Sequence, residues 1–343
     1  MEYLQVEKLK STQFPLKSLI GKLSFELGRN PKVGKAENKT KYIPKPKKAV
    51  LMISSDFELA WAFRFSKSQS NPVQNALEHG RLTRENVPAI VELCDKYNVP
   101  VTWATVGHLF LESCTSINGV AHPEIKRLSH FESPFWKFDQ GDWFKDDPCT
   151  DYKTSPEWYA PDLIKMIIES KVNHEIGSHT FSHIDCRESV CTQEVFRSEL
   201  AKCIEVAGKY NIKLKSFVFP GHTFGNFDVL PEMGFTSYRT NYGNILGYPI
   251  KKNNGLWEHE STAELDLRPT WSDKYQVYRY KKIIDRAIAN NAVCHFWFHP
   301  SFNPEFRKKI LPDVLEYIDK RRDSLFITTM GEYTDWLNTN INI

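Results

Sequence analysis

From residue 49 onward, short apolar runs alternate with stretches of helical periodicity. Seven runs are rich in β-branched and aromatic residues and have the length of strands, which they predict at residues 49–54, 100–106, 172–177, 215–219, 235–239, 293–299 and 325–329. Near-continuous apolar strands are typical of a parallel sheet with helices on its faces. Seven such units favour an α/β barrel.

Between the runs, apolar residues recur at the spacing of a helix that buries one face. In the first such stretch the positions i, i+3, i+4 and i+7 are Val87, Ile90, Val91 and Cys94. Thr83 stands where a helix cap is expected, so we predict that this helix starts there. The same spacing predicts further helices around residues 196–207, 283–288 and 310–318.

Residues 109–158 break this rhythm. They show no clean periodicity but hold many aromatic side chains, among them Phe131, Phe135, Trp136, Phe138, Trp143, Phe144, Tyr152 and Trp158. A long irregular segment inside a domain is usually functional. We predict an aromatic-rich insertion, whose rings either pack on the barrel or form a wall for a sugar-like substrate.

The first 48 residues differ from the remainder in charge. They hold eleven Lys and one Arg against four Glu, a balance of +8, so the other residues carry −5 of the total of +3. Gly and Pro are scattered through this segment, which predicts a basic N-terminal arm or linker followed by the barrel over residues 49–343.

Composition narrows the class of protein. Hydrophobic residues make up 41% and charged residues 25% of the chain, which excludes a wholly disordered protein. No apolar run approaches the ~20 residues of a membrane-spanning helix, so we expect no integral membrane segment. The seven cysteines are odd in number and form no Cys-x-x-Cys pair, which favours reduced thiols and a cytoplasmic location.

Polar side chains that could carry chemistry follow three of the predicted strands. Asp56 and Glu58 follow the first run, His179 and His183 follow the third, and His299 ends the sixth. The carboxyl ends of parallel strands meet at one edge of a sheet, where barrels place their chemistry. Two imidazoles and one carboxylate at that edge would suit a divalent metal, whereas capping or core histidines are the alternative.

The residues from His174 to His183 read His-Glu-Ile-Gly-Ser-His-Thr-Phe-Ser-His. They resemble the metal motif H-[ST]-x-x-H of the polysaccharide deacetylases, also called the NodB-homology or carbohydrate esterase 4 family. The resemblance covers about residues 49–335, and the motifs follow in the family's order.

This resemblance implies a distorted (β/α)7 barrel of the NodB type that binds one divalent metal ion, usually zinc, through a carboxylate and two histidines. Carried onto this chain, it implies His179 and His183 as metal ligands. Glu58 would be the third ligand, Asp56 the catalytic base and His299 the catalytic acid.

Two motifs depart from the family's pattern. The usual first motif has two adjacent aspartates, whereas Asp56 stands alone and the next carboxylate is Glu58. The usual Arg-x-Pro-Tyr motif appears as Val-Phe-Pro-Gly-His at residues 218–222, so the arginine that orients the base is missing. Arg239, at the end of the fifth run, either takes that role or is a surface or helix-capping arginine.

Further candidates for substrate contact lie near the same strand ends. His222 stands at the last position of the altered motif. Its side chain either faces the cavity or points away from it. Alternation along the sixth run places His295, Trp297 and His299 on one face. His299 is nearest the cavity mouth, and His295 is expected to be a hydrogen-bonded interior histidine.

These groups together predict a metal-dependent hydrolase that removes N-linked acetyl groups from amino sugars of a polysaccharide or glycan precursor. The metal would activate water, the base would remove its proton, and the acid would protonate the leaving amine. The alternatives are a formamide or cyclic-amide hydrolase of the same fold and a catalytically inactive glycan-binding barrel. We expect a carbohydrate substrate and no nucleic-acid partner, while the amino sugar, the metal and the oligomeric state stay open.

Overall fold

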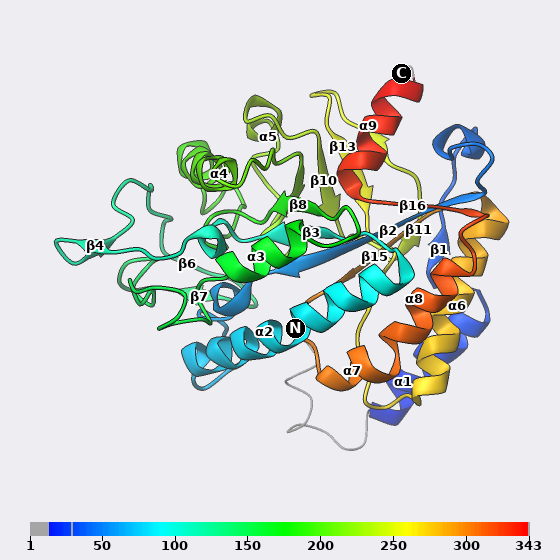
Figure 1. Ribbon diagram of the computed structural model, residues 1–343, viewed down its shortest axis with the longest axis horizontal. Coiled ribbons are helices and arrows are strands. Elements are labelled where there is room, and N and C mark those ends of the chain that lie inside the picture. The colour runs from blue at the N-terminus through cyan, green and yellow to red at the C-terminus, as the bar shows by residue number, and fades with distance from the viewer. Residues whose placement is uncertain (1–13, 29, 342–343) are drawn as a thin grey trace.

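A ten-stranded sheet runs through the centre of the molecule in the computed structural model, which describes residues 14–28 and 30–341 (Figure 1). Its strand order is β12-β13-β10-β9-β8-β3-β2-β15-β14, with β16 also paired to β2. Every pairing is parallel except β12 with β13. The strands are β2 (Ala49–Phe57), β3 (Thr102–Thr105), β8 (Glu175–Ser178), β9 (Ser216–Val218), β10 (Ser237–Thr240), β12 (Ile250–Lys251), β13 (Trp257–Glu260), β14 (Ala263–Glu264), β15 (Val293–Phe298) and β16 (Leu325–Thr328).

The predicted α/β fold with a distorted barrel is confirmed. Each of the seven predicted runs overlaps a strand of this sheet. The sheet is curled, and its end strands β12 and β14 do not pair with each other among the described residues. Sequence analysis missed β13, because Trp-Glu-His-Glu at 257–260 lacks the apolar run that marks the other strands.

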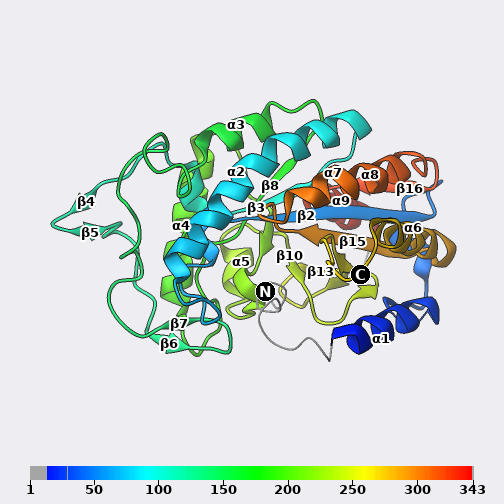
Figure 2. The ribbon, with the colours of Figure 1, turned by 90° about the horizontal axis from the view of Figure 1, so that it is seen from below.

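Helices cover the outside of the sheet (Figures 1 and 2). They are α1 (Phe14–Glu26), α2 (Pro72–Tyr97), α3 (Pro161–Ile168), α4 (Gln193–Gly208), α5 (Val229–Glu232), α6 (Asp273–Asn290), α7 (Pro304–Lys309), α8 (Leu311–Asp319) and α9 (Met330–Asn340). The described residues also form the short 3-10 helices η1 (Lys39–Tyr42), η2 (Leu59–Ala62), η3 (Gly107–Phe110) and η4 (Pro220–His222).

Helix α2 shows where the periodicity was correct and where the predicted cap was wrong. Its predicted apolar positions are buried: Val87, Ile90, Val91 and Cys94. The helix starts at Pro72, however, because the side chain of Asn71 accepts a hydrogen bond from the backbone N–H of Gln74. Thr83 lies inside the helix, and its hydroxyl donates to the carbonyl of His79.

The insertion at 109–158 forms an irregular lobe at one end of the molecule, on the left in Figures 1 and 2. Its strands pair in two short hairpins, β4 (Ser116–Ile117) with β5 (Val120–Ala121) and β6 (Phe131–Glu132) with β7 (Lys137–Phe138). Most of its aromatic rings are buried, including Phe131, Trp136, Phe138, Trp143, Phe144 and Trp158. Packing therefore accounts for most of them, whereas Phe135 is exposed.

The described part of the basic N-terminal segment contacts the barrel. Phe25 in α1 is buried, and Glu26 accepts hydrogen bonds from Tyr275 and Tyr278 of α6. Strand β1 (Lys32–Val33) pairs with β11 (Ile245–Leu246). The division of the chain at residue 48 stays a prediction, and residues 1–13 lie outside the described part.

The structure also bears on membrane-spanning helices and on the state of the cysteines. Across 14–28 and 30–341, no helix has the length and apolar character needed to cross a membrane. All seven cysteines carry free thiols.

Candidate metal centre and active site

Glu58, His179 and His183 meet at the carboxyl edge of the sheet. The Oε1 atom of Glu58 lies 3.2 Å from His179 Nε2 and 3.3 Å from His183 Nε2. Sheet register explains this meeting, because Asp56 of β2 and Gly177 of β8 both align with Ala104 of the intervening strand β3. Glu58 and His179 each follow two residues later, so they leave the sheet at the same level.

A strained loop turns the second imidazole toward the first. Thr180 and His183 both have φ of 58°, in the left-handed region that non-glycine residues rarely adopt. Hydrogen bonds from the backbone of Gly107 to the Thr180 carbonyl and from Ile184 to the Thr180 hydroxyl hold the loop. The two imidazole centroids are 5.0 Å apart as a result.

The protonation states in this group fit a divalent cation. His179 Nδ1 lies 2.8 Å from the carbonyl of Val218, which only accepts, so Nδ1 carries a proton and the other ring nitrogen, Nε2, faces Glu58. Burial lowers the pKa of His183, against the opposing charge of Glu58. Burial raises the pKa of Glu58, but His299 and His183 outweigh it and hold that pKa well below its usual range. Imidazole nitrogens and an ionised carboxylate are the ligand types that zinc takes.

Asp56 is held by an arginine from another strand. Arg239 Nη1 and Nη2, on β10, each donate to a separate carboxylate oxygen of Asp56 at 2.7 Å. Both side chains are buried, and Arg239 also donates to the hydroxyl of Ser54. Burial raises the pKa of Asp56, but the Arg239 guanidinium outweighs it and the pKa is lowered. Arg239 is thus neither a surface nor a helix-capping residue, and its position suits the orienting role.

His299 lies across the site from these groups. Its Nε2 is 3.8 Å from Glu58 Oε1 and 3.9 Å from Asp56 Oδ2, and its Nδ1 is 3.4 Å from Glu264 Oε1. Burial lowers the pKa of His299, but Glu58 and Glu264 outweigh it and raise the pKa to about 9. An imidazolium at this place can donate a proton at neutral pH.

Comparison with known proteins agrees with this arrangement. A family model described as polysaccharide deacetylase matches residues 76–230, the stretch that holds His179 and His183. The chain is therefore similar to the polysaccharide deacetylases over residues 76–230. Asp56, Glu58 and His299 lie outside the matched stretch, so their roles stay predictions. No curated protein matches the chain.

Solved structures share the deacetylase fold at low sequence identity. A protein described as a polysaccharide deacetylase from Pseudomonas aeruginosa PAO1 has a TM-score of 0.59 at 13% identity, covering 87% of this chain and 94% of its own. Another so described, from Mycobacterium smegmatis, has a TM-score of 0.57 at 13% identity, with 87% and 93% covered. The allantoinase PuuE has a TM-score of 0.58 at 13% identity, with 87% and 93% covered.

Aromatic and imidazole rings border this group of polar side chains. The rings of His222 and Trp297 are 5.3 Å apart and nearly perpendicular, and the Arg239 guanidinium lies 4.9 Å from the Trp297 ring. Burial lowers the pKa of His222 to about 4, so its ring is neutral at pH 7. From the insertion, Trp136 reaches to 5.3 Å from His183. The predicted candidates therefore surround the centre, although their contact with substrate stays a prediction.

Sequence reasoning missed Glu264. It stands in β14, a strand of two residues that pairs with β15, and Glu264 aligns with Trp297. Neither an apolar run nor a helical period marks this position. His295, in contrast, is fully buried and hydrogen-bonds with Ser54, as expected for an interior histidine.

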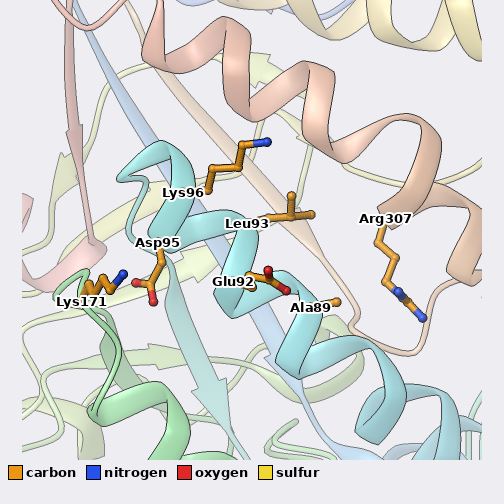
Figure 3. A pocket seen from close by; sticks show the side chains of 7 residues that line it. All are labelled: Ala89, Glu92, Leu93, Asp95, Lys96, Lys171 and Arg307. Atoms are coloured by element: carbon orange, nitrogen blue, oxygen red, sulfur yellow. The ribbon is translucent and has the colours of Figure 1, made fainter.

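The surface of the described residues includes two hollows. One adjoins the site and is lined by Asn241, Glu264 and Trp297 together with Gly21 and Phe25 of α1. The other lies on the outer face of α2 (Figure 3), and its lining residues are Ala89, Glu92, Leu93, Asp95, Lys96, Lys171 and Arg307. The hollow on α2 shares no residue with the site, so the first is the better place for a substrate.

Proposed function

We propose that this protein is a metal-dependent hydrolase that removes N-linked acetyl groups from amino sugars of a polysaccharide or glycan precursor. The observation that carries the proposal is the approach of Glu58 Oε1 to the Nε2 atoms of His179 and His183, with His299 within 3.9 Å of both Glu58 and Asp56. The match of residues 76–230 to the polysaccharide deacetylase family model supports it.

Glu58, His179 and His183 would hold one divalent metal ion, for which zinc fits the ligand types. Such an ion would polarise the amide carbonyl and would lower the pKa of the attacking water to about 7. The protein would supply ligand atoms whose orientation is already fixed in the fold. The bond from His179 Nδ1 to the Val218 carbonyl fixes the ring so that Nε2 faces Glu58.

Asp56 would accept the proton of the attacking water as base. Its two bonds to Arg239 keep the carboxylate ionised and fix its plane, at some cost in basicity. His299 would deliver a proton to the departing nitrogen, because an amine cannot leave as an anion. Glu264 holds the opposite nitrogen of that ring and favours its charged form.

A formamide or cyclic-amide hydrolase is the second candidate. The altered first motif, with Glu58 two residues after Asp56, and the fold shared with an allantoinase both favour it. The same groups would act on either kind of C–N bond. The third possibility, an inactive glycan-binding barrel, rested on the missing motif arginine, and Arg239 supplies a guanidinium at the base.

The test measures metal content and product release together. We expect the purified protein to release acetate from at least one member of a panel of N-acetylated saccharides, and His179→Ala to lose both the hydrolysis and the corresponding metal ion. His130→Ala is the matched control, because His130 is an exposed histidine bonded to the Gly141 carbonyl, away from the site. A panel of formamides and cyclic amides run beside the saccharides separates the two hydrolase candidates. An active His179→Ala protein without that metal would refute the proposal.

A further inference from the structure

A second cluster of metal-binding side chains lies where the insertion meets the barrel. His108 comes from η3, directly after β3, and Cys114, His122 and Asp147 come from the insertion. One nitrogen, sulfur or oxygen atom from each of the four lies within 4.8 Å of the others. None of these residues takes part in the site described above.

The carboxylate of Asp147 is at the centre of the cluster. Its Oδ2 atom is 3.1 Å from His108 Nε2 and 3.0 Å from His122 Nε2, and the Cys114 sulfur is 3.6 Å away. Its other oxygen, Oδ1, accepts hydrogen bonds from the backbone N–H of Cys149 and from the hydroxyl of Tyr159. The supporting groups thus hold Oδ1 and leave Oδ2 directed at the two imidazoles.

His108 presents an unpaired nitrogen to this centre. Its Nδ1 is 3.2 Å from the carbonyl of Trp158, which can only accept, so Nδ1 carries the proton. The ring is completely buried. Its other nitrogen, Nε2, lies 3.1 Å from Asp147 Oδ2, yet no well-aligned hydrogen bond to that atom is formed in the described structure. A buried nitrogen this close to a carboxylate oxygen without such a bond is the arrangement expected where both atoms bind a common cation.

We propose that His108, Cys114, His122 and Asp147 bind a structural zinc ion. Two nitrogens, one sulfur and one oxygen complete a tetrahedron, which is typical of closed zinc sites that leave no position for substrate. Bonds of about 2.0 to 2.3 Å to a tetrahedral ion place ligand atoms roughly 3.3 to 3.6 Å apart. The observed separations of 3.0, 3.1 and 3.6 Å from Asp147 Oδ2 are near that range.

The site would connect the insertion to the barrel. Apart from the two hairpins of two-residue strands, the described insertion has no regular element between η3 and α3. The ion would tie this segment at Cys114, His122 and Asp147 to His108 on the barrel side. Metal binding of this kind contributes directly to folding, because the site does not exist in the unfolded chain.

The backbone around the cluster is strained, as expected for a place held by a strong interaction. His122 and Cys149 have φ of 46° and 47°, in the left-handed region. The His108 ring also packs against Trp61, at 4.4 Å between centroids, and the backbone N–H of Trp61 donates to the Glu58 carbonyl. The second site would therefore also support the loop that carries Glu58.

The experiment uses Co²⁺ as the probe in the full-length chain, because cobalt bound to a thiolate gives a charge-transfer absorption in the near ultraviolet. Glu58, His179 and His183 include no thiol, so this absorption reports on the second site alone. In a His179→Ala background we expect one equivalent of bound Co²⁺ with the thiolate absorption. Cys114→Ser in that background should lose both, while Cys149→Ser, the matched control at the neighbouring cysteine, should keep both.

The design also separates this inference from the proposed function. If only the second site binds metal, the wild-type protein and His179→Ala take up the same single equivalent with the same absorption. If only the proposed active site binds metal, the wild-type equivalent has no thiolate absorption and disappears in His179→Ala. That second result, or an absorption that persists in Cys114→Ser, would overturn the inference.

A measurement without a change at the cluster covers the case in which Cys114→Ser does not fold. The thermal midpoint of His179→Ala is compared with and without a chelator and after zinc is restored. We expect the chelator to lower the midpoint and zinc to recover it, because an ion that binds only the folded chain stabilises it. If the midpoint is unchanged, the four side chains form a polar network without a metal ion, and the proposed zinc site is overturned.

Discussion

The pairing of Arg239 with Asp56 gives the sharpest test of how this barrel holds a buried carboxylate at the site. Both side chains are buried, and two hydrogen bonds of 2.7 Å join them. Replacing Arg239 with Met removes the guanidinium and leaves the carboxylate buried without its partner. We expect this change to lower the free energy of unfolding by about 3 to 5 kcal/mol, the usual cost of breaking a buried ion pair from one side.

Removing both charges should cost less than the sum of the single changes. In Asp56→Asn the carboxylate becomes an amide, and in the double variant neither charge is left unpaired. The cation–π contact of Arg239 with Trp297 is lost equally in the single and the double variant, so it cancels. We therefore expect a coupling free energy of about 2 to 3 kcal/mol between the two positions.

The assay is guanidinium unfolding of the four proteins at neutral pH in the presence of a chelator, so that bound metal does not contribute. Arg239→Lys is the control, because it keeps the charge but has no planar fork and should fall between wild type and Arg239→Met. Single changes that add to within about 0.5 kcal/mol would refute the reasoning.

The same pair predicts the direction of an acid effect. Because the pKa of Asp56 is lowered in the folded protein, ionisation of this group stabilises the fold above its ordinary pKa of about 3.9. The contribution is lost as the pH falls through the folded pKa. Arg239→Met should therefore lose less stability than wild type between neutral pH and that acid range, and an equal loss in both would contradict the assignment.

Two further predictions concern the ring of His299 and the wall of the site. Glu264→Gln removes a negative charge 3.4 Å from His299, so the pKa of His299 should fall and the basic limb of the pH profile of kcat/KM should move to lower pH by roughly half a unit to one unit; an unmoved limb would exclude His299 as the acid. Gly221→Ala should lower the free energy of unfolding by about 1 to 3 kcal/mol in a denaturant titration, because Gly221 has φ of 54° and an added Cβ would lie 2.5 Å from the Trp136 ring; stability equal to wild type would show that this ring moves freely.

The expected meeting of side chains at the strand ends is observed for residues that directly follow a buried apolar strand. Asp56 and Glu58 directly follow a buried strand, and His179 and His183 directly follow another, so the shared edge of a parallel sheet predicts that they meet. His299 follows for the same reason. Their proximity was therefore accessible from the order of apolar runs along the chain.

Glu264 and the insertion cluster had no such pattern. Glu264 stands in a strand of two residues, and Cys114, His122 and Asp147 are spread over an irregular segment. The altered motif removed the arginine from its usual place, and only the alignment of β10 within the sheet brings Arg239 to Asp56. Each of these contacts joins residues that are far apart in the chain, and no periodic pattern in the sequence marks their positions.

The alternation of apolar strands and amphipathic helices specifies the α/β barrel, because burying apolar surface is a local requirement that repeats along the polypeptide. Which polar groups pair is a different matter, since hydrogen bonds and charge interactions depend on separations of a few ångströms between distant segments. The guanidinium on Asp56, the carboxylate behind His299 and the unpaired nitrogen of His108 all depend on such separations, and these exist only once the chain has folded.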